Sequence, residues 1–373
     1  MYDVAVIGAG PAGAAAALSA LRAAPGARVL LVDKADFPRD KSCGDGIAPH
    51  ALDELARLGV ASVLADQVPV RTLQLVSPSG LGASSVMARP TYVVPRTVFD
   101  ARLVSAAVSR GAVLERRTVR SLDDVSARVI IGADGANGVV RRLIGVERQD
   151  EATVAVAVRG YLSWPTRDPE QVIVMDGRDW PAYAWRFDTG TGVSNVGFGM
   201  LLPSLRAQPR GKDALQSRLV ELLPEAASAV RLRSHHLPLS TGRPVQPAGR
   251  FLLAGDAASL VNPLTGEGIF YALLSGRLAG AAAVSGGDPG LAYRASLERE
   301  LGRHLSHTTL LSRLTAHSRV LNAGVRAVDA DPDAFHALVE VGLGRGLITP
   351  RLVGALGREA GRSLARRLPS TAG

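Results

Sequence analysis

The feature that most constrains the fold is a glycine-rich turn close to the N-terminus. An apolar segment, Val4 to Ile7, runs into Gly8-x-Gly10-x-x-Gly13, and an alanine-rich segment, Ala12 to Ala24, follows. An apolar strand, glycines at this spacing and a helix, in that order, are the fingerprint of a dinucleotide-binding β–α unit. The sequence therefore predicts a Rossmann-like α/β domain with the turn at its ligand-binding end.

Each residue type in this segment has a physical reason. Gly8 permits the tight turn, Gly10 lets the backbone approach a pyrophosphate, and Gly13 allows the helix to pack closely on the strand. The helix start, where Ala12 lies, offers unpaired N–H groups and a partial positive charge to phosphates. Asp33 ends the second apolar segment, roughly 20 residues past the glycines, where its carboxylate can accept hydrogen bonds from a ribose diol.

Length and composition set the outer limits. The 373 residues are enough for two domains, and 47% hydrophobic residues without a long apolar run indicate a soluble globular protein with no transmembrane helix. The chain enters its first strand at once and leaves no room for a signal peptide, so a cytoplasmic location is expected. One cysteine, Cys43, excludes an internal disulfide. No metal site is expected.

The formal net charge of +9 comes almost entirely from arginine. These arginines are scattered, whereas nucleic-acid binding calls for a clustered basic face with stacking aromatics, so no nucleic-acid partner is expected. The exception is the segment 351–368, where leucines fall at helical spacing and arginines lie mostly between them. Such a helix can contact an anionic membrane surface peripherally, or it can pack on the protein body with a solvated arginine face. The residues concerned are Leu352, Leu356, Leu364 and Leu368, with Arg358, Arg362, Arg366 and Arg367.

The hydrophobic pattern predicts the elements beyond the first β–α unit. Helices are expected over 51–58, 96–111 and 213–223, and strands over 68–94 around a turn at 78–80, 113–119 and 128–131. The segment 36–46 is a polar loop. Residues 151–244 are otherwise strand-rich, and the chain is helical from Pro263 onward.

Several segments carry a family resemblance. Three of them, in order, resemble the flavoprotein monooxygenase superfamily typified by p-hydroxybenzoate hydroxylase: Gly8-x-Gly10-x-x-Gly13, Gly132-Ala133-Asp134-Gly135 and Gly255-Asp256. Four more resemble the geranylgeranyl reductase family within it: Lys41-Ser42-Cys43-Gly44-Asp45-Gly46, Pro95-Arg96-x-x-Phe99-Asp100, Tyr183-Ala184-Trp185-Arg186-Phe187 and Pro263-Leu264-Thr265-Gly266-Glu267-Gly268-Ile269. The resemblance covers about residues 1–300.

The resemblance implies an α/β fold in which a Rossmann-like FAD-binding domain of the p-hydroxybenzoate hydroxylase type carries an inserted antiparallel β-sheet substrate domain and a helical C-terminal region. The FAD-binding domain is then discontinuous, over 1–66, 92–149 and 248–285. The substrate-binding sheet takes 67–91 and 150–247, and the C-terminal helical region takes 286–373.

The resemblance also implies which residues contact FAD. Asp256 would hydrogen-bond the ribityl or phosphate portion, and Gly268 and Ile269 would open a helix whose N–H groups face the flavin pyrimidine edge. Arg96 matches a cofactor-contacting arginine, with a surface charge at a helix start as the alternative. Gly138 departs from the superfamily, where serine is common. The full set is Gly8, Gly10, Ala12, Gly13, Asp33, Cys43, Gly44, Gly46, Arg96, Val119, Asp256, Gly268 and Ile269.

Cys43 is the candidate catalytic residue. The family places it beside the isoalloxazine ring where an alkene would be reduced, and a thiol there can supply or relay a proton. A positioning role, or simple packing as a small buried hydrophobe, is the alternative. Tyr183, Trp185 and Phe187 are candidates for substrate contacts, with ordinary sheet packing as the other explanation.

Two functions follow from the resemblance. The first is an FAD-dependent oxidoreductase that reduces C=C bonds of an isoprenoid, geranylgeranyl-type chain by hydride transfer from reduced flavin. The second is a monooxygenase that hydroxylates an aromatic or terpenoid substrate through a flavin hydroperoxide. Both take a hydrophobic small molecule. No second G-x-G-x-x-G follows a strand, so electrons are expected from transiently bound NAD(P)H, a ferredoxin or a partner reductase.

Overall fold

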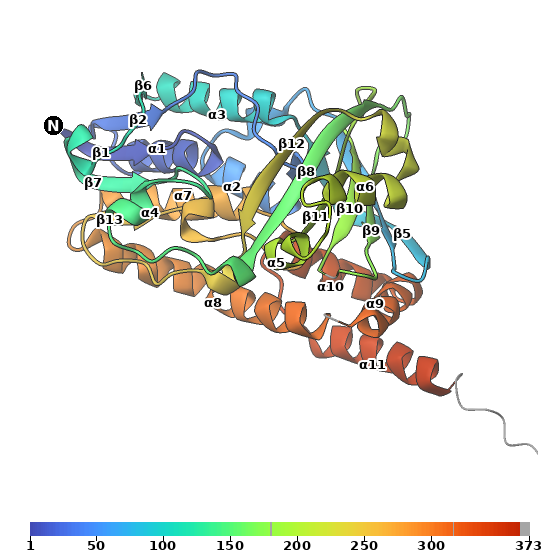
Figure 1. Ribbon diagram of the computed structural model, residues 1–373. Coiled ribbons are helices and arrows are strands. Elements are labelled where there is room, and N and C mark those ends of the chain that lie inside the picture. Colours follow the sequence, from blue (N-terminus) through green and yellow to red (C-terminus); the bar gives the residue numbers. More distant parts are fainter. Residues whose placement is uncertain (180, 316, 366–373) are drawn as a thin grey trace, which may run out of the picture.

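The computed structural model describes residues 1–179, 181–315 and 317–365, except for the side chains of 360–365. Two β-sheets lie side by side, and a row of helices from the C-terminal part of the chain runs beneath both of them (Figure 1). Trp180 and the tail residues Arg366, Arg367 and Leu368 lie outside the described residues, and nothing is said of the side chains of Arg362 and Leu364.

The first sheet is parallel and has the order β13-β7-β1-β2-β6. Its strands other than the exposed edge strand β6 are mostly buried and rich in valine, isoleucine and leucine, as expected for parallel strands covered on both faces. This sheet confirms the predicted Rossmann-like α/β architecture. The strands are β1 (Tyr2–Ile7), β2 (Val29–Asp33), β6 (Val113–Arg116), β7 (Ala127–Gly132) and β13 (Phe251–Leu253).

Two helices that are far apart in the sequence pack against each other beside this sheet. They are α1 (Pro11–Ala23) and α7 (Ile269–Ala283), the most extensively contacting pair of helices in the described chain. Gly276 and Gly280 of α7 lie directly against the backbone of Ala12 and Ala16 of α1, so small residues on both helices permit the close approach. The other helices of this half are α2 (Pro49–Arg57), α3 (Arg96–Ser109) and α4 (Val140–Leu143).

The second sheet has the order β12-β8-β11-β10-β9-β4-β5-β3 and is antiparallel except between β4 and β9. The strands of that one parallel pair come from two separate stretches of the chain. The strands are β3 (Gly46–Ile47), β4 (Pro69–Val76), β5 (Gly82–Val93), β8 (Val154–Ser163), β9 (Glu170–Met175), β10 (Tyr183–Asp188), β11 (Val193–Leu201) and β12 (Val230–Pro238). Helices α5 (Leu202–Arg206) and α6 (Asp213–Leu222) interrupt the run between β11 and β12.

The C-terminal helices link the two halves. Helix α8 packs on β13 near its start, and α9 and α10 pack on β5 of the second sheet. A cluster of buried side chains forms there, with Leu75 and Met87 from the sheet and Val325, Val328 and Phe335 from the helices. The helices are α8 (Pro289–Leu314), α9 (Ser318–Ala330), α10 (Pro332–Leu343) and α11 (Pro350–Ala365). No helix of the described chain combines the length and apolarity needed to cross a membrane.

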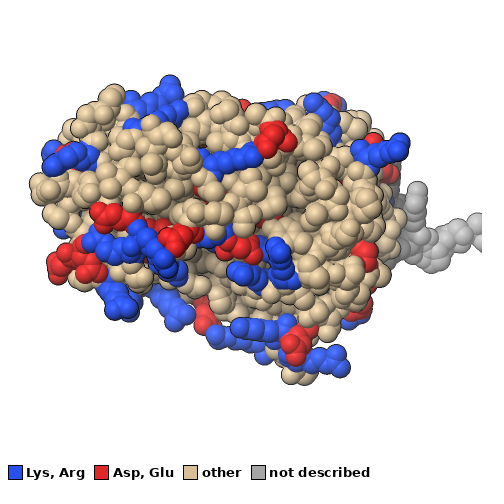
Figure 2. Space-filling view, turned by 90° about the horizontal axis from the view of Figure 1, so that it is seen from above, with Lys and Arg blue, Asp and Glu red and all other residues tan. Residues whose placement is uncertain are grey.

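Short 3-10 helices fill several of the connections. They are Ala61–Leu64, Leu122–Asp124, Glu151–Thr153, Pro224–Ser228, Ser240–Gly242 and Gly255–Ala258. Basic and acidic side chains are interspersed on the face seen in Figure 2 rather than gathered into one basic field. Ion pairs such as Arg116 with Asp36 and Arg89 with Asp53 show the same mixing.

Two boundaries differ from the sequence pattern. The strand expected over 113–119 ends at Arg116, because its neighbour β2 ends at Asp33, the register partner of Arg116. The segment 36–46, expected as a polar loop, contributes Gly46 to the short strand β3, which pairs with Tyr92 and Val93 of β5. This pairing ties the cysteine-bearing loop to the second sheet.

Candidate functional site

The glycine turn after β1 leaves no room for side chains. A Cβ at Gly13 would lie 1.8 Å from the carbonyl oxygen of Gly8, and a Cβ at Gly8 would lie 2.3 Å from the carbonyl oxygen of Ala133. Gly8 also has a φ of 99°, which a residue with a side chain rarely adopts. Helix α1 starts at Pro11 with Ala12 buried behind it, so its N-terminus faces the space beside the turn.

Two guanidinium groups lie next to this turn. A Cβ at Gly10 would be 3.3 Å from Nη2 of Arg39 and 3.8 Å from Nη2 of Arg96. Arg96 is 3% exposed and grips the carboxylate of Asp100 with two hydrogen bonds of 2.6 and 2.8 Å. Nε of Arg39 is buried without a hydrogen-bond partner among the described residues. Positive charge, an orphaned donor and a helix N-terminus together suit the pyrophosphate of a dinucleotide.

Asp33 and Val119 lie at the end of the site expected to hold a ribose and an adenine. The Asp33 carboxylate accepts hydrogen bonds from the N–H groups of Ala9 (2.9 Å) and Ala35 (3.0 Å), which fixes it at the end of β2. Val119 is buried beyond the end of β6. Their contacts with a cofactor stay predictions.

Asp134 explains why glycine stands at position 138. Its carboxylate accepts hydrogen bonds from the N–H groups of Val139 (2.6 Å) and Val140 (3.0 Å) at the start of α4. A Cβ at Gly138 would lie 2.2 Å from this carboxylate, so even the smallest side chain would displace it.

Asp256 lies beside the N-terminus of α7. That helix begins at Ile269 with Gly268 as its N-cap, and a Cβ on Gly268 would lie 3.8 Å from Oδ1 of Asp256. Nζ of Lys41 is 3.1 Å from Oδ2 of Asp256, and Nε2 of His235 is 3.9 Å from the same atom. Burial alone would raise the pKa of the Asp256 carboxyl, but Lys41 and His235 hold that pKa below its ordinary value.

The ion pair predicts an acid sensitivity. Lys41→Met is expected to shift the midpoint of acid-induced FAD release upward by about 1 pH unit, because loss of the cation raises the pKa of Asp256. A carboxylate whose pKa is lower in the folded than in the unfolded protein stabilises the fold at pH values above the unfolded-state pKa. This contribution is lost as the pH falls through the folded-state pKa. FAD fluorescence on release would report the midpoint. Lys212→Met, at an exposed lysine, is the control, and equal midpoints in all three proteins would contradict the assignment.

Cys43 lies in a loop that is tied to the second sheet. Its carbonyl oxygen accepts a hydrogen bond of 2.8 Å from Nδ2 of Asn195, and the hydroxyl of Ser42 donates to the carbonyl of Arg233. Burial raises the pKa of the Cys43 thiol, with Asp45 adding to the rise and Arg96 opposing it. The sulfur is therefore held as a thiol, the form that can donate a proton.

Tyr183, Trp185 and Phe187 alternate along β10 and lie on one face of the sheet. Trp185 donates a hydrogen bond of 2.9 Å from Nε1 to Oδ1 of Asn195, and its ring lies 6.0 Å from that of Tyr183 and 6.3 Å from that of Phe187 between centroids. A Cβ at Gly44 would lie 3.4 Å from the Phe187 ring and 3.5 Å from Nε1 of Trp185. The aromatic row is thus packed directly on the cysteine loop.

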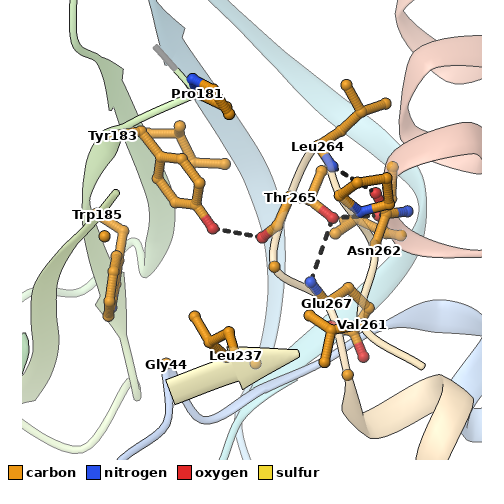
Figure 3. Close-up of a pocket in the computed structure, with 18 of the residues that line it drawn as sticks. Gly44, Pro181, Tyr183, Trp185, Leu237, Val261, Asn262, Leu264, Thr265 and Glu267 are labelled. Atoms are coloured by element: carbon orange, nitrogen blue, oxygen red, sulfur yellow. Dashed lines mark hydrogen bonds between the residues drawn. The ribbon is translucent and has the colours of Figure 1, made fainter. Parts of the chain in front are cut away.

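The loop before α7 is anchored from two sides. The Tyr183 hydroxyl points across the pocket to the carbonyl of Thr265 and donates a hydrogen bond to it (Figure 3). The Thr265 hydroxyl donates to the carbonyl of Gly342 in α10 (2.6 Å), and Asn262 bonds the same carbonyl. The loop expected to face the flavin is therefore held by the aromatic strand and by the C-terminal helices together.

These elements enclose one long cavity of about 310 Å³. At one end it is lined by the cysteine loop, Arg96 and Asp256. Its middle is lined by the aromatic row and by apolar side chains of the second sheet. Its far end is lined by α8 to α11, through Leu311, Leu321, Val325, Val328, Phe335, Val339, Leu352 and Leu356.

The sequence missed several residues of this site. Arg39 gave no signal in the pattern, because a lone arginine in a polar loop looks solvated. Gln171 of β9 is 4% exposed and lines the cavity, and its side-chain amide, unlike its backbone, forms no hydrogen bond with a described residue. Glu267 lines it too, and burial raises the pKa of its carboxyl to about 7, although the N–H groups of Phe270 and Ile269 bond to it. Asp45 is the fourth residue of the site that the sequence pattern did not single out.

The predicted cofactor residues fall into two groups, of which one lines an end of the cavity and the other, with the glycine turn, Asp33 and Val119, lies outside its lining. Gly8, Gly10, Ala12 and Gly13 form the turn, with Arg96 beside it, and Cys43, Gly44, Gly46, Asp256, Gly268 and Ile269 surround the cavity end. The cradle without room for Cβ atoms and the unpartnered Arg39 donor fit FAD. Bound FAD would supply two-electron redox chemistry at the cavity end next to Cys43.

Comparison with known proteins agrees with this geometry. The sequence matches the family described as FAD binding domain over residues 1–120 and 112–273. It is 36% identical to menaquinone reductase of Mycolicibacterium smegmatis, with 86% of each chain covered. It is 32% identical to digeranylgeranylglycerophospholipid reductase 1 of Methanopyrus kandleri, with 76% of this chain and 80% of that one covered.

Solved structures show the same fold. A geranylgeranyl bacteriochlorophyll reductase-like protein from Thermoplasma acidophilum superposes with a TM-score of 0.78 at 18% identity, covering 98% of this chain and 99% of that one. A flavin-dependent brominase superposes with a TM-score of 0.72 at 16% identity, covering 98% and 100%. The chain therefore belongs to the geranylgeranyl reductase family, within the FAD-dependent monooxygenase-like superfamily, and is an FAD-dependent oxidoreductase.

Proposed function

We propose that this oxidoreductase saturates C=C bonds in the isoprenoid chain of a prenylated quinone or a geranylgeranyl lipid. The observation that carries the proposal is the continuous apolar cavity between the cysteine loop and the far wall formed by α8 to α11. A polyprenyl chain threaded along it would bring a double bond next to the expected flavin position. A compact aromatic substrate would leave the far end unfilled.

Apolar burial supplies the binding energy for such a substrate. Each buried CH₂ group contributes about 0.8 kcal/mol, so a twenty-carbon chain gains more than any single polar contact can give. The walls from Leu73, Leu75, Ile173 and Met175 on the sheet side are apolar. The named activities of the menaquinone and digeranylgeranylglycerophospholipid reductases support this substrate class. The side-chain amide of Gln171 forms no hydrogen bond with a described residue, so it is available on this wall to a polar headgroup.

The residues at the reacting end suit alkene reduction. Bound reduced FAD would supply the hydride for one alkene carbon, and the protein must then provide a proton for the other. Cys43 is held as a thiol on the cavity wall and is the proposed donor of that proton. Trp185 and Phe187 lie next to Gly44 and leave little space for movement of the loop that carries the thiol.

The proposal is tested by anaerobic reduction of the bound FAD with dithionite, removal of excess reductant, and addition of a polyprenyl quinone or a digeranylgeranyl lipid. We expect flavin reoxidation without O₂ and a product heavier by two hydrogens. With a quinone, that gain must persist after the quinol is reoxidised in air, because only a saturated C=C bond survives this step.

A quinone with a fully saturated side chain is the matched control, since it accepts electrons only at its ring. A product that carries one added oxygen atom and forms only in air would contradict the proposal and support a monooxygenase. Chemical reduction makes the result independent of whether NAD(P)H, a ferredoxin or a partner reductase is the natural donor.

A further inference from the structure

Asp45 is a fully buried acid two residues from Cys43. Its side chain is 0% exposed, and its φ of 61° lies in the left-handed region that a non-glycine residue rarely adopts. The backbone there is held by the N–H of Val94, which donates to the carbonyl of Asp45 at 2.9 Å. Strained backbone conformations cluster at functional sites, so a buried carboxyl in such a conformation on a cavity wall is a candidate functional group.

The two oxygens of this carboxyl have different surroundings. Oδ2 accepts hydrogen bonds from the Tyr161 hydroxyl (2.5 Å) and from Nδ2 of Asn195 (2.8 Å). Oδ1 is inaccessible to solvent and has no hydrogen-bond partner among the described residues. Asn195 also holds the carbonyl of Cys43, so a single amide joins the carboxyl to the cysteine backbone. Burial of an ionised carboxylate with one orphaned oxygen costs more than burial of the neutral acid.

The charges around the carboxyl set its proton affinity close to neutrality. Burial raises the pKa of Asp45 to about 6, against the lowering effects of Tyr161 and Arg159 on β8, Asn195 on β11 and Arg96 on α3. The Arg159 guanidinium stacks 4.5 Å above the Tyr161 ring. An acid of this strength can both give up and regain a proton at working pH.

We propose that Asp45 is the proton reservoir behind Cys43, an inference that rests on the proposed alkene reduction. The hydride from reduced flavin forms one C–H bond. The Cys43 S–H bond breaks as its proton forms the second C–H bond, and the Asp45 O–H bond breaks as its proton restores the thiol. The remaining carboxylate is stabilised by Tyr161 and Asn195 until a proton from solvent returns to it through the hydroxyl of the half-buried Tyr161. The alkene thus gains two electrons and two protons, and the flavin loses two electrons.

Glu267 is the other buried acid on this cavity with a raised pKa, and its geometry differs. Its Oε1 accepts a hydrogen bond of 2.7 Å from the N–H of Phe270 and caps the first turn of α7. Glu267→Gln therefore serves as a matched control, in which a buried acid of the same cavity is neutralised away from the Tyr161–Asn195 network.

The first test needs no turnover. Cys43 is the only cysteine, so the rate of its alkylation by iodoacetamide in the FAD-loaded protein reports its thiolate fraction directly. In the wild type, we expect a plot of the logarithm of this rate against pH to change slope near pH 6. The ionised Asp45 then disfavours the negative charge of the Cys43 thiolate. Asp45→Asn should remove the bend and speed alkylation at neutral pH, whereas Glu267→Gln should keep the bend.

The second test follows the pH dependence of single-turnover flavin reoxidation by the prenyl substrate. The wild-type rate should fall above the pKa of Asp45, and Asp45→Asn should slow reoxidation by about 100-fold and abolish that dependence. Tyr161→Phe removes a donor to the charged form, which raises the pKa of Asp45, so the fall should move to higher pH. The absorbance of bound FAD verifies that each variant folds. If Asp45→Asn does not fold, the shift of the pH profile in Tyr161→Phe is the test.

The outcomes separate this inference from the function on which it rests. A wild type that reduces no prenyl chain refutes the proposed function. A wild type that reduces the chain, with Asp45→Asn equal to it in rate and pH profile, overturns the reservoir and leaves the function standing. An alkylation profile without a bend in the wild type also overturns it.

Discussion

Gly324→Phe is expected to raise the KM for a twenty-carbon prenyl substrate by more than about 100-fold and to leave that for a ten-carbon substrate unchanged. Gly324 lies on α9 and lines the far part of the cavity, where a Cβ would face Cδ2 of Leu356 at 3.8 Å. A phenyl ring there occupies the space of the distal isoprene units. Exclusion of one five-carbon unit removes about 4 kcal/mol of burial energy.

The measurement is a KM series over prenyl chain length with the same headgroup. Gly357→Phe is the control, because Gly357 is exposed on α11 and a Cβ there meets no atom within 4 Å. Equal losses for short and long chains in Gly324→Phe would show that the substrate does not enter this end of the cavity.

Gly276→Val is expected to abolish FAD retention and to lower the free energy of unfolding by about 3 kcal/mol or more. A Cβ at Gly276 would lie 2.1 Å from the carbonyl oxygen of Ala12 and 3.0 Å from Cβ of Ala15, so α1 and α7 must separate. The N-termini of these two helices face opposite parts of the cofactor site, at Gly10 and at Gly268. Separation of the two helices would therefore displace both N-termini from their positions at the cofactor site.

FAD absorbance after gel filtration and urea unfolding followed by circular dichroism would measure the two effects. Gly286→Ala, in the loop after α7, is the control, because a Cβ there meets no atom within 4 Å. Stoichiometric FAD and wild-type stability in Gly276→Val would mean that the helix contact does not support the cofactor site.

The cofactor half of the fold was predictable because its determinants are local. The glycine turn, the strand before it and the helix after it lie within two dozen residues, and β1 and α1 form there as expected. The start of α7 at Ile269 agrees with the family resemblance, whereas the hydrophobic pattern alone had placed the start of helical structure at Pro263. Contacts between these segments follow from the family resemblance rather than from either segment alone.

The far wall of the cavity was not predictable from pattern. The tail was expected to form a helix with leucines on one side, but periodicity does not say what such leucines cover. In the described part, Leu352 is 1% exposed and Leu356 lines the cavity, while Arg351 and Arg358 lie close to Asp331 at the start of α10. This packing matches the alternative in which the helix lies on the protein body.

The buried polar network around Asp45 was equally hidden. Its bonds join residues more than 100 positions apart, from the cysteine loop to β8 and β11. Aspartate among glycines in a loop normally indicates a solvated turn. Only the fold shows that strands β8, β10 and β11 close over it and that its Oδ1 has no described partner.

The two ends of the cavity have separate origins in the chain. The reacting end is built by the first 100 residues and the segment 255–269, whereas the far wall comes from residues beyond 310. Mutations in α9 to α11 can therefore lengthen, shorten or reshape the chain-binding part while the redox end keeps its residues. Under the proposed function, a family built on this plan can change the prenyl chains that it accepts by drift in its C-terminal helices and retain one redox chemistry.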